Sequence, residues 1–328
     1  MTAATGPGGV PLAAGQEPVE PVRGWWSRHA LNTGTVFALT VRGVRLLPRR
    51  VSYAIGHVGT WLAWRLMPAT SDAIASNLEP LFPNESQQAR RRRALDTYRS
   101  YAADTIDFLR ALSASPDEAR ALFDLDANGG LSLERVVSGG RGALLVAGHF
   151  GNWEIGGILM ARVLGLPLTI VAMAEADPEI NRIRGEIRTA MGIRTLEVRR
   201  SLETALQIRR TLAENRFVAL LVDRHVGRDR IAVSLLGRPA WFLQTPALLS
   251  YLTGTPMVPC FLERIGPGRF ATVALEPIYV DRDLPRQEAI ARATQQVADA
   301  LGSRIRLKPH LWYQFYPYWS APDEGTLQ

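Results

Sequence analysis

The sequence predicts an α/β fold: a mixed, mainly parallel central sheet flanked by helices, with an N-terminal interfacial helical segment. Three observations support this prediction. Short apolar runs alternate with amphipathic stretches from residue 141 onward, which is typical of strands covered by helices. The 328 residues are 47% hydrophobic and 21% charged, as in an ordinary globular protein. Four of the eight tryptophans lie before residue 70, among apolar stretches interrupted by arginines: Trp25, Trp26, Trp61 and Trp64.

The net charge and the content of cysteine and histidine limit which macromolecules, lipids and metal ions the protein is expected to bind. The formal charge is +7, and Lys308 is the only lysine among 38 basic residues. Codon bias in a GC-rich genome accounts for much of the arginine, but a basic surface also suits anionic lipid headgroups or an acidic carrier protein. We expect no nucleic-acid partner, because no helix-turn-helix, zinc-finger or RNA-recognition signature is present. Cys260 is the only cysteine and the five histidines lack ligand spacing, so no metal is expected.

The first 70 residues predict a tail followed by membrane-interface helices. Residues 1–24 are rich in Gly, Pro, Ala and Thr without periodicity, which predicts a disordered tail and not a secretory signal peptide. Residues 25–70 contain no uninterrupted apolar run of the roughly 18–20 residues that span a bilayer. Their tryptophans and arginines favour helices that lie on one leaflet, although they could instead cover the sheet of a soluble protein. We expect residues 25–325 to form one domain, with 71–320 as its α/β catalytic core.

The remaining elements are predicted in chain order. An apolar stripe predicts a long helix over 87–112, and the run from Ser115 to Glu118 has the cap, proline and acidic first turn of another helix start. Short apolar runs predict strands at 143–147, 168–172, 194–198, 217–222, 257–263 and 270–275, and a second strand follows the glycine turn after residue 225, before L-G-R-P. Helices are predicted at 153–164, 178–191, 201–214, 245–253 and 285–301.

The stretch 143–157, A-L-L-V-A-G-H-F-G-N-W-E-I-G-G, combines a buried strand, a glycine turn and a helix start. His149 lies on the turn, Asn152 is the expected helix cap and Glu154 follows in the first helical turn. A carboxylate in that place can fix the tautomer of the histidine and stabilise the imidazolium, which would make His149 a general base. Since a strand–turn–helix with one histidine and one glutamate is also common in structural roles, the spacing alone leaves both interpretations open.

His149–Glu154, H-F-G-N-W-E, resembles the H-x4-D/E motif of lysophospholipid-type acyltransferases, in particular the branch of the bacterial lipid A late acyltransferases and the mycobacterial phosphatidylinositol mannoside acyltransferases. The resemblance extends from about residue 41 to residue 319. It implies O-acylation, in which an acyl thioester of acyl carrier protein or coenzyme A donates its chain to a hydroxyl of a membrane glycolipid. No metal or bound cofactor is implied. His149 would deprotonate the acceptor hydroxyl, and Glu154 would orient His149.

A second segment, F-V-A-L-L-V-D-R-H from residue 217 to 225, looks like the D-R-D or D-Q-D segment of the same branch. Asp223 stands at the acidic position that lies near the catalytic histidine in the mannoside acyltransferases, so we expect it to support His149 or the acceptor. A salt bridge to Arg224 or Arg228 is the structural alternative. His225 stands where the family usually has a second acid, and we expect it to be an exposed loop residue.

Further site residues are implied by position. Arg188 matches a family arginine that points into the site, where it would hold a phosphate or an oxyanion. Asn152 and Arg224 are expected to contribute to substrate binding. Thr245 is a further candidate, since Q-T-P resembles the family turn that opens a helix lining the acyl groove. The aromatic segment 311–319 is expected to pack mainly as core.

The resemblance also implies a location and leaves two alternatives. The protein is expected at the cytoplasmic face of the bacterial inner membrane, peripheral or monotopic, with membrane lipids as partners. One alternative is an acyltransferase for a lysophospholipid or an amino-lipid. The other is a non-catalytic lipid-binding or scaffold protein that keeps the same fold.

Overall fold

A mixed seven-stranded sheet forms the centre of the protein, which confirms the predicted fold class. The computed structural model describes residues 34–112, 114–125, 142–173, 177–198, 202–225 and 229–319; the predicted tail, Trp25 and Trp26 lie outside these ranges. The strands of the main sheet are β1 (Phe123–Asp124), β2 (Leu144–Ala147), β3 (Leu168–Ala172), β4 (Arg194–Glu197), β5 (Phe217–Leu221), β8 (Met257–Gly266) and β9 (Arg269–Ala274). A separate hairpin consists of β6 (Ile231–Leu235) and β7 (Arg238–Phe242).

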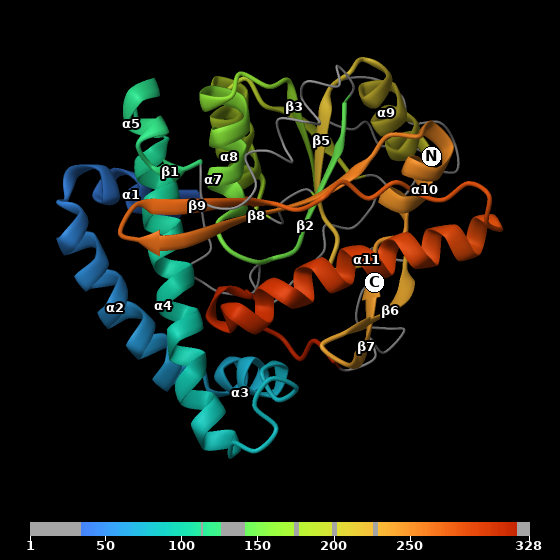
Figure 1. Cartoon of the computed structure of the whole chain (residues 1–328). Coiled ribbons are helices and arrows are strands. Elements are labelled where there is room, and N and C mark those ends of the chain that lie inside the picture. Colours follow the sequence, from blue (N-terminus) through green and yellow to red (C-terminus); the bar gives the residue numbers. More distant parts are fainter. Residues whose placement is uncertain are drawn as a thin grey trace, which may run out of the picture.

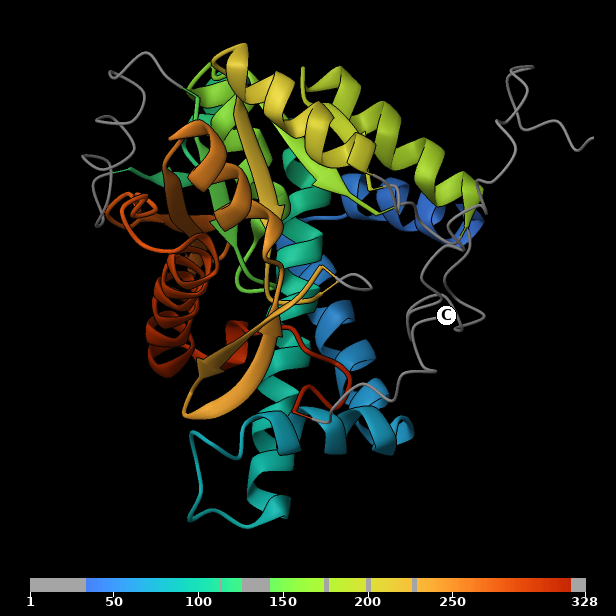
Figure 2. The same cartoon turned by 90° about the vertical axis from the view of Figure 1, so that its right-hand side faces the viewer.

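Helices surround the sheet on both faces (Figures 1 and 2). In chain order they are α1 (Gly34–Leu46), α2 (Arg49–Leu66), α3 (Pro68–Asn77), α4 (Gln87–Ala111), α5 (Pro116–Arg120), α7 (Trp153–Ile158), α8 (Pro178–Ala190), α9 (Leu202–Ala213), α10 (Thr245–Thr253) and α11 (Arg286–Leu307). Two short segments complete them: the π-helical turn η2 (Leu159–Val163) and the 3-10 turn η3 (Pro309–Leu311). None of the described helices combines the length and apolar character that crossing a bilayer requires.

The strand order places two chain segments side by side that are far apart in sequence. The order is β1-β9-β8-β2-β5-β3-β4, and every pairing is parallel except that of β8 with β9. Ala147 at the end of β2 is in register with Leu221 at the end of β5. The residues that follow these two strands therefore leave the sheet at the same edge, next to each other. In open α/β sheets this carboxyl edge is where ligands bind.

Alternating side chains of the strands supply two apolar cores. Leu144 and Val146 of β2 face the core that α9, α10 and α11 cover, whereas Leu145 faces the core covered by α5, α7 and η2. These two clusters account for the near-continuous apolar runs of the parallel strands, since a strand buried on both faces needs apolar residues at every position. The sheet edge that carries the site is thus held from both sides.

A buried ion cluster joins the N-terminal helices to the sheet. Arg264 of β8 donates hydrogen bonds to Asp104 at 2.6 and 2.9 Å and to Asp107 at 2.6 Å, both on α4. Tyr53 of α2 donates to Asp107 at 2.6 Å, and α2 runs alongside α4 in both views (Figures 1 and 2). Burial raises the pKa of Asp104 to about 6, although Arg264 opposes the rise. Asp104 also accepts the hydroxyl of Tyr313 at 2.6 Å, which links this cluster to the C-terminal segment.

Several element boundaries differ from the predictions. The expected helix over 153–164 ends its α-helical part at Ile158 and continues as η2. The last helix is longer than expected and reaches Leu307. The strands β1 and β7 are absent from the predicted set, because β1 has only two residues and Pro239 interrupts the apolar run of β7.

Candidate active site

His149 and Asp223 meet at the carboxyl edge of the sheet. Each lies two residues beyond the end of its strand, β2 for His149 and β5 for Asp223. Val222 N donates to Ala147 O at 2.8 Å, so the pairing of the two strands extends up to this point. The Nδ1 atom of His149 lies 2.7 Å from Oδ1 of Asp223. Parallel pairing in register therefore brings together two residues 74 positions apart.

Asp223 is fully buried and accepts hydrogen bonds on both carboxylate oxygens. The backbone N–H of His149 donates to Oδ1 and Oδ2 at 3.0 Å each. Gln314 Nε2 donates to Oδ2 at 2.7 Å. A buried carboxylate needs such partners because an unpaired charge away from water costs several kcal/mol. The groups that hydrogen-bond this carboxylate in the described ranges are donors, so the site holds Asp223 as an acceptor.

The electrostatics of the pair favour an ionised aspartate and a neutral histidine. Burial lowers the pKa of His149 by penalising the imidazolium, and Arg224 lowers it further, while Asp223 opposes both effects. Burial raises the pKa of Asp223, but the charge and hydrogen bonds of His149 together with Arg224 outweigh it, and the pKa lies below its ordinary value. The proton of the neutral imidazole then lies on Nδ1, facing the carboxylate. Nε2 is left unprotonated.

Nε2 is the ring nitrogen that the contact with Asp223 leaves unused. It has no hydrogen-bond partner in the described ranges, and the His149 side chain is 16% exposed. The ring of Trp153 packs edge-on against the imidazole, with centroids 5.3 Å apart. An imidazole oriented by a buried carboxylate and open at Nε2 has the arrangement of a general base.

Two glycines allow the turn that carries His149. At Gly148 a Cβ atom would lie 2.7 Å from the Leu301 side chain and 3.2 Å from Asp223 Cγ, which leaves no room for a side chain. Gly151 has φ +63°, and a Cβ there would lie 2.0 Å from the carbonyl oxygen of Leu262. Only glycine adopts this backbone readily. The close contacts hold the turn against β8 and α11.

The side-chain amide of Asn152 hydrogen-bonds within the protein at both its oxygen and its nitrogen. Its Oδ1 accepts the N–H of Ile155 at 3.2 Å and so caps α7, as predicted. Its Nδ2 donates to the carbonyl oxygen of Asp104 at 2.9 Å, and the residue is buried. Both ends of the amide are therefore used within the protein. Asn152 thereby links α7 to α4, and its contact with substrate stays a prediction.

Glu154 is not the residue that orients His149. Its Oε1 lies 3.4 Å from Arg184 and 4.0 Å from Arg188, both on α8, and within the described ranges it has no hydrogen bond with His149. The expected pairing is corrected because α7 begins at Trp153 and its first turn directs Glu154 toward α8, whereas the imidazole turns toward Asp223 at the end of β5. A catalytic role of Glu154 by another route stays a prediction.

Arg224 and His225 follow Asp223 on the same loop. Arg224 Nε donates to Gln314 Oε1 at 3.1 Å, and its Nη2 donates to Tyr313 O at 2.9 Å. It also lies over the ring of Tyr316, 5.2 Å from the centroid. Arg224 and Asp223 therefore share the partner Gln314 in place of the alternative salt bridge between them; Arg228, the other partner considered, lies outside the described residues. His225 is partly buried, not exposed as predicted.

Thr245 opens α10, as the Q-T-P turn predicts. Its backbone N–H donates to Asp229 at 3.0 Å. Its neighbours along the chain line a small apolar cavity of about 10 Å³ together with side chains of β2 and α11 and Val222, the residue before Asp223. Thr245 thus lies next to residues that line this apolar cavity. A direct contact of Thr245 with substrate stays a prediction.

The C-terminal segment contributes side chains and backbone that the sequence did not indicate as functional. Gly151 N donates to Leu311 O at 2.9 Å, and Tyr313 N donates to His149 O at 2.7 Å. Gln314 reaches Asp223 directly. The predicted core packing of this segment is present, with Trp312 and Tyr313 buried. The signal for the further role was one polar residue, Gln314, inside the aromatic run L-W-Y-Q-F-Y.

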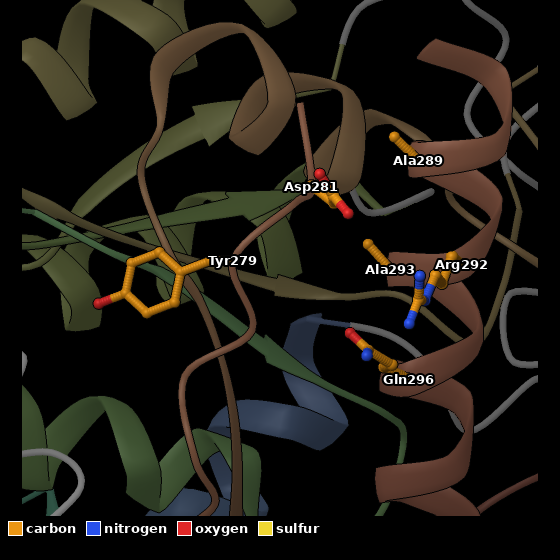
Figure 3. Close-up of a pocket in the computed structure, with 6 residues that line it drawn as sticks. All are labelled: Tyr279, Asp281, Ala289, Arg292, Ala293 and Gln296. Atoms are coloured by element: carbon orange, nitrogen blue, oxygen red, sulfur yellow. The ribbon is translucent and has the colours of Figure 1, made fainter. Parts of the chain in front are cut away.

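A shallow polar pocket lies elsewhere, on the first half of α11 (Figure 3). It measures about 140 Å³ and is lined by Tyr279, Asp281, Ala289, Arg292, Ala293 and Gln296. Leu301, which packs on Gly148, comes later on the same helix. None of the six lining residues hydrogen-bonds with His149 or Asp223, all of which are described. The chemistry of the dyad and this pocket are therefore separate. Within the described ranges no group of acidic, histidine or cysteine side chains could hold a metal ion.

Comparisons with known proteins identify the family of the chain. The profile of the family described as bacterial lipid A biosynthesis acyltransferase matches residues 25–321. A phosphatidylinositol mannoside acyltransferase of Mycolicibacterium smegmatis is 25% identical over 289 residues, covering 80% of this chain and 91% of the relative. One of Mycobacterium tuberculosis is 27% identical over 197 residues, covering 59% of this chain and 60% of the relative. The chain therefore belongs to the bacterial lipid A biosynthesis acyltransferase family and is an O-acyltransferase.

Proposed function

We propose that this acyltransferase moves a fatty acyl chain from a thioester of acyl carrier protein or coenzyme A to a hydroxyl of a membrane glycolipid. The observation that carries the proposal is the 2.7 Å contact of His149 Nδ1 with the buried Asp223, which leaves Nε2 for the acceptor. Two relatives named phosphatidylinositol mannoside acyltransferases support a mannoside as the acceptor, and the description of the family supports a lipid A precursor. They favour these acceptors over a lysophospholipid or an amino-lipid.

The chemical step is a direct transfer. His149 Nε2 takes the proton of the acceptor hydroxyl as its oxygen attacks the thioester carbonyl carbon. The tetrahedral intermediate then collapses, the C–S bond breaks, and the departing thiolate takes the proton from Nε2. Asp223 stays ionised throughout and stabilises the imidazolium that forms between the two proton transfers. Because no side chain is acylated, no enzyme-bound ester is required.

Arginines on α8 supply positive charge on the side of α7 that carries Glu154. Arg188 lies 4.0 Å from the Glu154 carboxylate, and its side chain is 14% exposed. Arg184 lies 3.4 Å from the same oxygen. A guanidinium held by a neighbouring carboxylate is pre-oriented for a phosphate, which it binds in a bidentate manner. In this proposal Glu154 positions the two arginines, and they bind phosphate of the donor or the acceptor.

Exposed apolar side chains on α1 and α2 form the surface that we propose contacts the membrane. They are Leu39, Leu46, Val51, Ile55, Val58, Trp61, Leu62 and Leu66, whose exposed fractions range from 41% to 85%. Arg65 lies over the ring of Trp61, 5.8 Å from its centroid. Apolar side chains beside arginines suit an anionic bilayer surface, into which a helix settles at headgroup depth. The proposed location is the cytoplasmic face of the inner membrane.

The test of the reaction is an acyl-transfer assay on the purified chain. Two radiolabelled donors with the same acyl chain are used, acyl-coenzyme A and the acyl thioester of acyl carrier protein. Each is offered with one of four acceptors in detergent: a phosphatidylinositol mannoside, a lipid A precursor, a lysophospholipid or an amino-lipid. His149→Ala is expected to abolish transfer, and His57→Ala, on exposed α2, to retain it. Undiminished transfer by His149→Ala would overturn the mechanism. Labelling of the lysophospholipid or amino-lipid alone would replace the proposed acceptor.

The membrane surface is tested separately, by sedimentation with anionic vesicles. Val58→Asp introduces a charge at a position of α2 that is 61% exposed, and the partition coefficient is expected to fall by about tenfold. Leu206→Asp is the matched control, because Leu206 is an exposed leucine of α9 on another part of the protein, 42% exposed. Equal loss of vesicle binding by both variants would contradict the assignment to α2.

A further inference from the structure

Among the described residues, Gln314 is the only glutamine that hydrogen-bonds a side chain of the dyad. It is 1% exposed. Its Nε2 donates to Oδ2 of Asp223 at 2.7 Å, and its Oε1 accepts Arg224 Nε at 3.1 Å. The amide therefore lies between an anion and a cation. Asn77 Nδ2 donates to the Gln314 carbonyl oxygen at 3.0 Å, which fixes the backbone as well.

The orientation of this amide is determined by its charged neighbours. A flipped amide would place its oxygen against the carboxylate of Asp223 and its NH2 group against the guanidinium of Arg224. Both new contacts would be repulsive, whereas both existing contacts are charge-assisted hydrogen bonds. The neighbouring Tyr313 accepts Arg224 Nη2 on its carbonyl at 2.9 Å, so rotation of Arg224 away from Gln314 would break a second bond.

We propose that Gln314 is a positioning residue of the transfer reaction, which holds Asp223 as an anion and thereby keeps His149 a neutral base. The inference rests on the proposed function and deepens it. A donor to Oδ2 stabilises the carboxylate and makes it a weaker base toward the imidazole. Loss of that donor makes Asp223 more basic, so the imidazolium gains stability and the pKa of His149 rises. A glutamine that only filled space in the core would have no such effect.

The backbone N–H of His149 also donates to Oδ2, at 3.0 Å, but no other described side chain around the pair replaces the Gln314 donor. Arg224 lies on the loop after β5 and acts on both His149 and Asp223 through its charge. The C-terminal segment adds the hydroxyls of Tyr316 and Tyr318, whose pKa values burial raises above the ordinary value, so both stay neutral. Trp153 from α7 and Leu301 from α11 contribute apolar surface.

The experiment follows the pKa of His149 by NMR in the full chain with labelled histidine, using His149→Gln to identify its resonance. Gln314→Glu places a second carboxyl group against Asp223 and is expected to raise the pKa of His149 by about one to two units. Gln314→Met removes the donor at similar volume and is expected to give a smaller rise. Tyr318→Phe is the matched control, because its hydroxyl donates at 3.0 Å to the Asp223 backbone carbonyl and not to the carboxylate. Tyr318→Phe should leave the pKa of His149 unchanged.

A measurement on the unmodified chain guards against variants that fail to fold. The side-chain amide resonance of Gln314 should titrate with the same midpoint as His149, since protonation of the ring adds a positive charge beside the Asp223 carboxylate to which the amide donates. An amide resonance that stays constant through the His149 titration, or folded variants with an unshifted His149, would overturn the proposal. If these couplings are present but the chain transfers no acyl group, the proposed function fails and the positioning role stands. If transfer occurs without the couplings, only the positioning role fails.

Discussion

Replacing Asp223 by asparagine removes the charge of the dyad at constant size. The carboxylate accepts from His149 Nδ1 at 2.7 Å, from His149 N at 3.0 Å and from Gln314 Nε2 at 2.7 Å. The new NH2 group must therefore face a donor. If it faces Gln314, the conflict cannot be relieved by a flip of that amide, because Arg224 donates to the other end. If it faces His149, moving the imidazole proton to Nε2 relieves the conflict.

The second arrangement costs least, because neutral imidazole changes tautomer easily. We expect Asp223→Asn to hold His149 with its proton on Nε2, where the acceptor hydroxyl needs a lone pair. An equivalent change in the serine protease triad lowers kcat by about 10⁴-fold through the wrong tautomer, which corresponds to about 5.5 kcal/mol in the barrier. We expect a loss of that order here.

The assay is single-turnover acyl transfer at pH 8, where the wild-type base is neutral. Circular dichroism confirms that the variant is folded, and the nitrogen shifts of labelled His149 report the tautomer. Asp299→Asn is the matched control, since Asp299 is exposed on α11 and, among the described residues, accepts a hydrogen bond from Gln295 alone. Transfer by Asp223→Asn within about tenfold of the wild type, or a proton that remains on Nδ1, would refute this reasoning.

Further predictions concern pH, the role of Glu154 and the buried ion cluster. Because the pKa of His149 is lowered from 6.5, the neutral base form persists below pH 6.5. The value of kcat/KM should therefore fall only when the pH drops through the lowered pKa of His149. A loss of activity that begins above pH 6.5 would contradict this. Glu154→Gln should raise the KM for the phosphate-bearing substrate several-fold in steady-state assays. It should leave the acidic side of the pH–rate profile unchanged, whereas a shift of that side would indicate direct contact of Glu154 with His149. Arg264→Met leaves Asp104 and Asp107 without their shared cation, so the free energy of unfolding in urea should fall by about 3–5 kcal/mol at pH 8. An unchanged urea midpoint would contradict the importance of that ion cluster.

The local pattern of the sequence predicts the elements better than their arrangement. Apolar runs identify β2, β5, β8 and β9, and the polar residues after them identify strand ends that could carry chemistry. The order in which strands pair is a property of the packed chain, so nothing local shows that β2 lies beside β5. The resemblance to the family predicted that Asp223 lies near His149, and the structure places the two side chains 2.7 Å apart.

Residues that depend on direction or distance were the ones that sequence reasoning misplaced. The spacing H-x4-E suggests that Glu154 returns to His149, but the helix starts at Trp153 and directs the carboxylate to α8. Gln314 is 165 positions from His149, and an isolated polar residue in an aromatic run has no period that predicts its partner. Asn152 was assigned both to the turn and to substrate, and the structure confirms the helix cap and adds a bond from its amide to α4.

The contacts of the C-terminal segment have a consequence for the biosynthesis of the protein. During translation His149 and Asp223 leave the ribosome well before Leu311 and Gln314, whose bonds to Gly151 and Asp223 complete the turn. A nascent chain that has folded β2 and β5 therefore carries a buried carboxylate with an empty donor position until the last helix and the aromatic run have emerged. Premature termination before residue 311 would leave a chain with nearly all of its sheet and an unfinished base, so the acquisition of activity should coincide with release of the full-length chain.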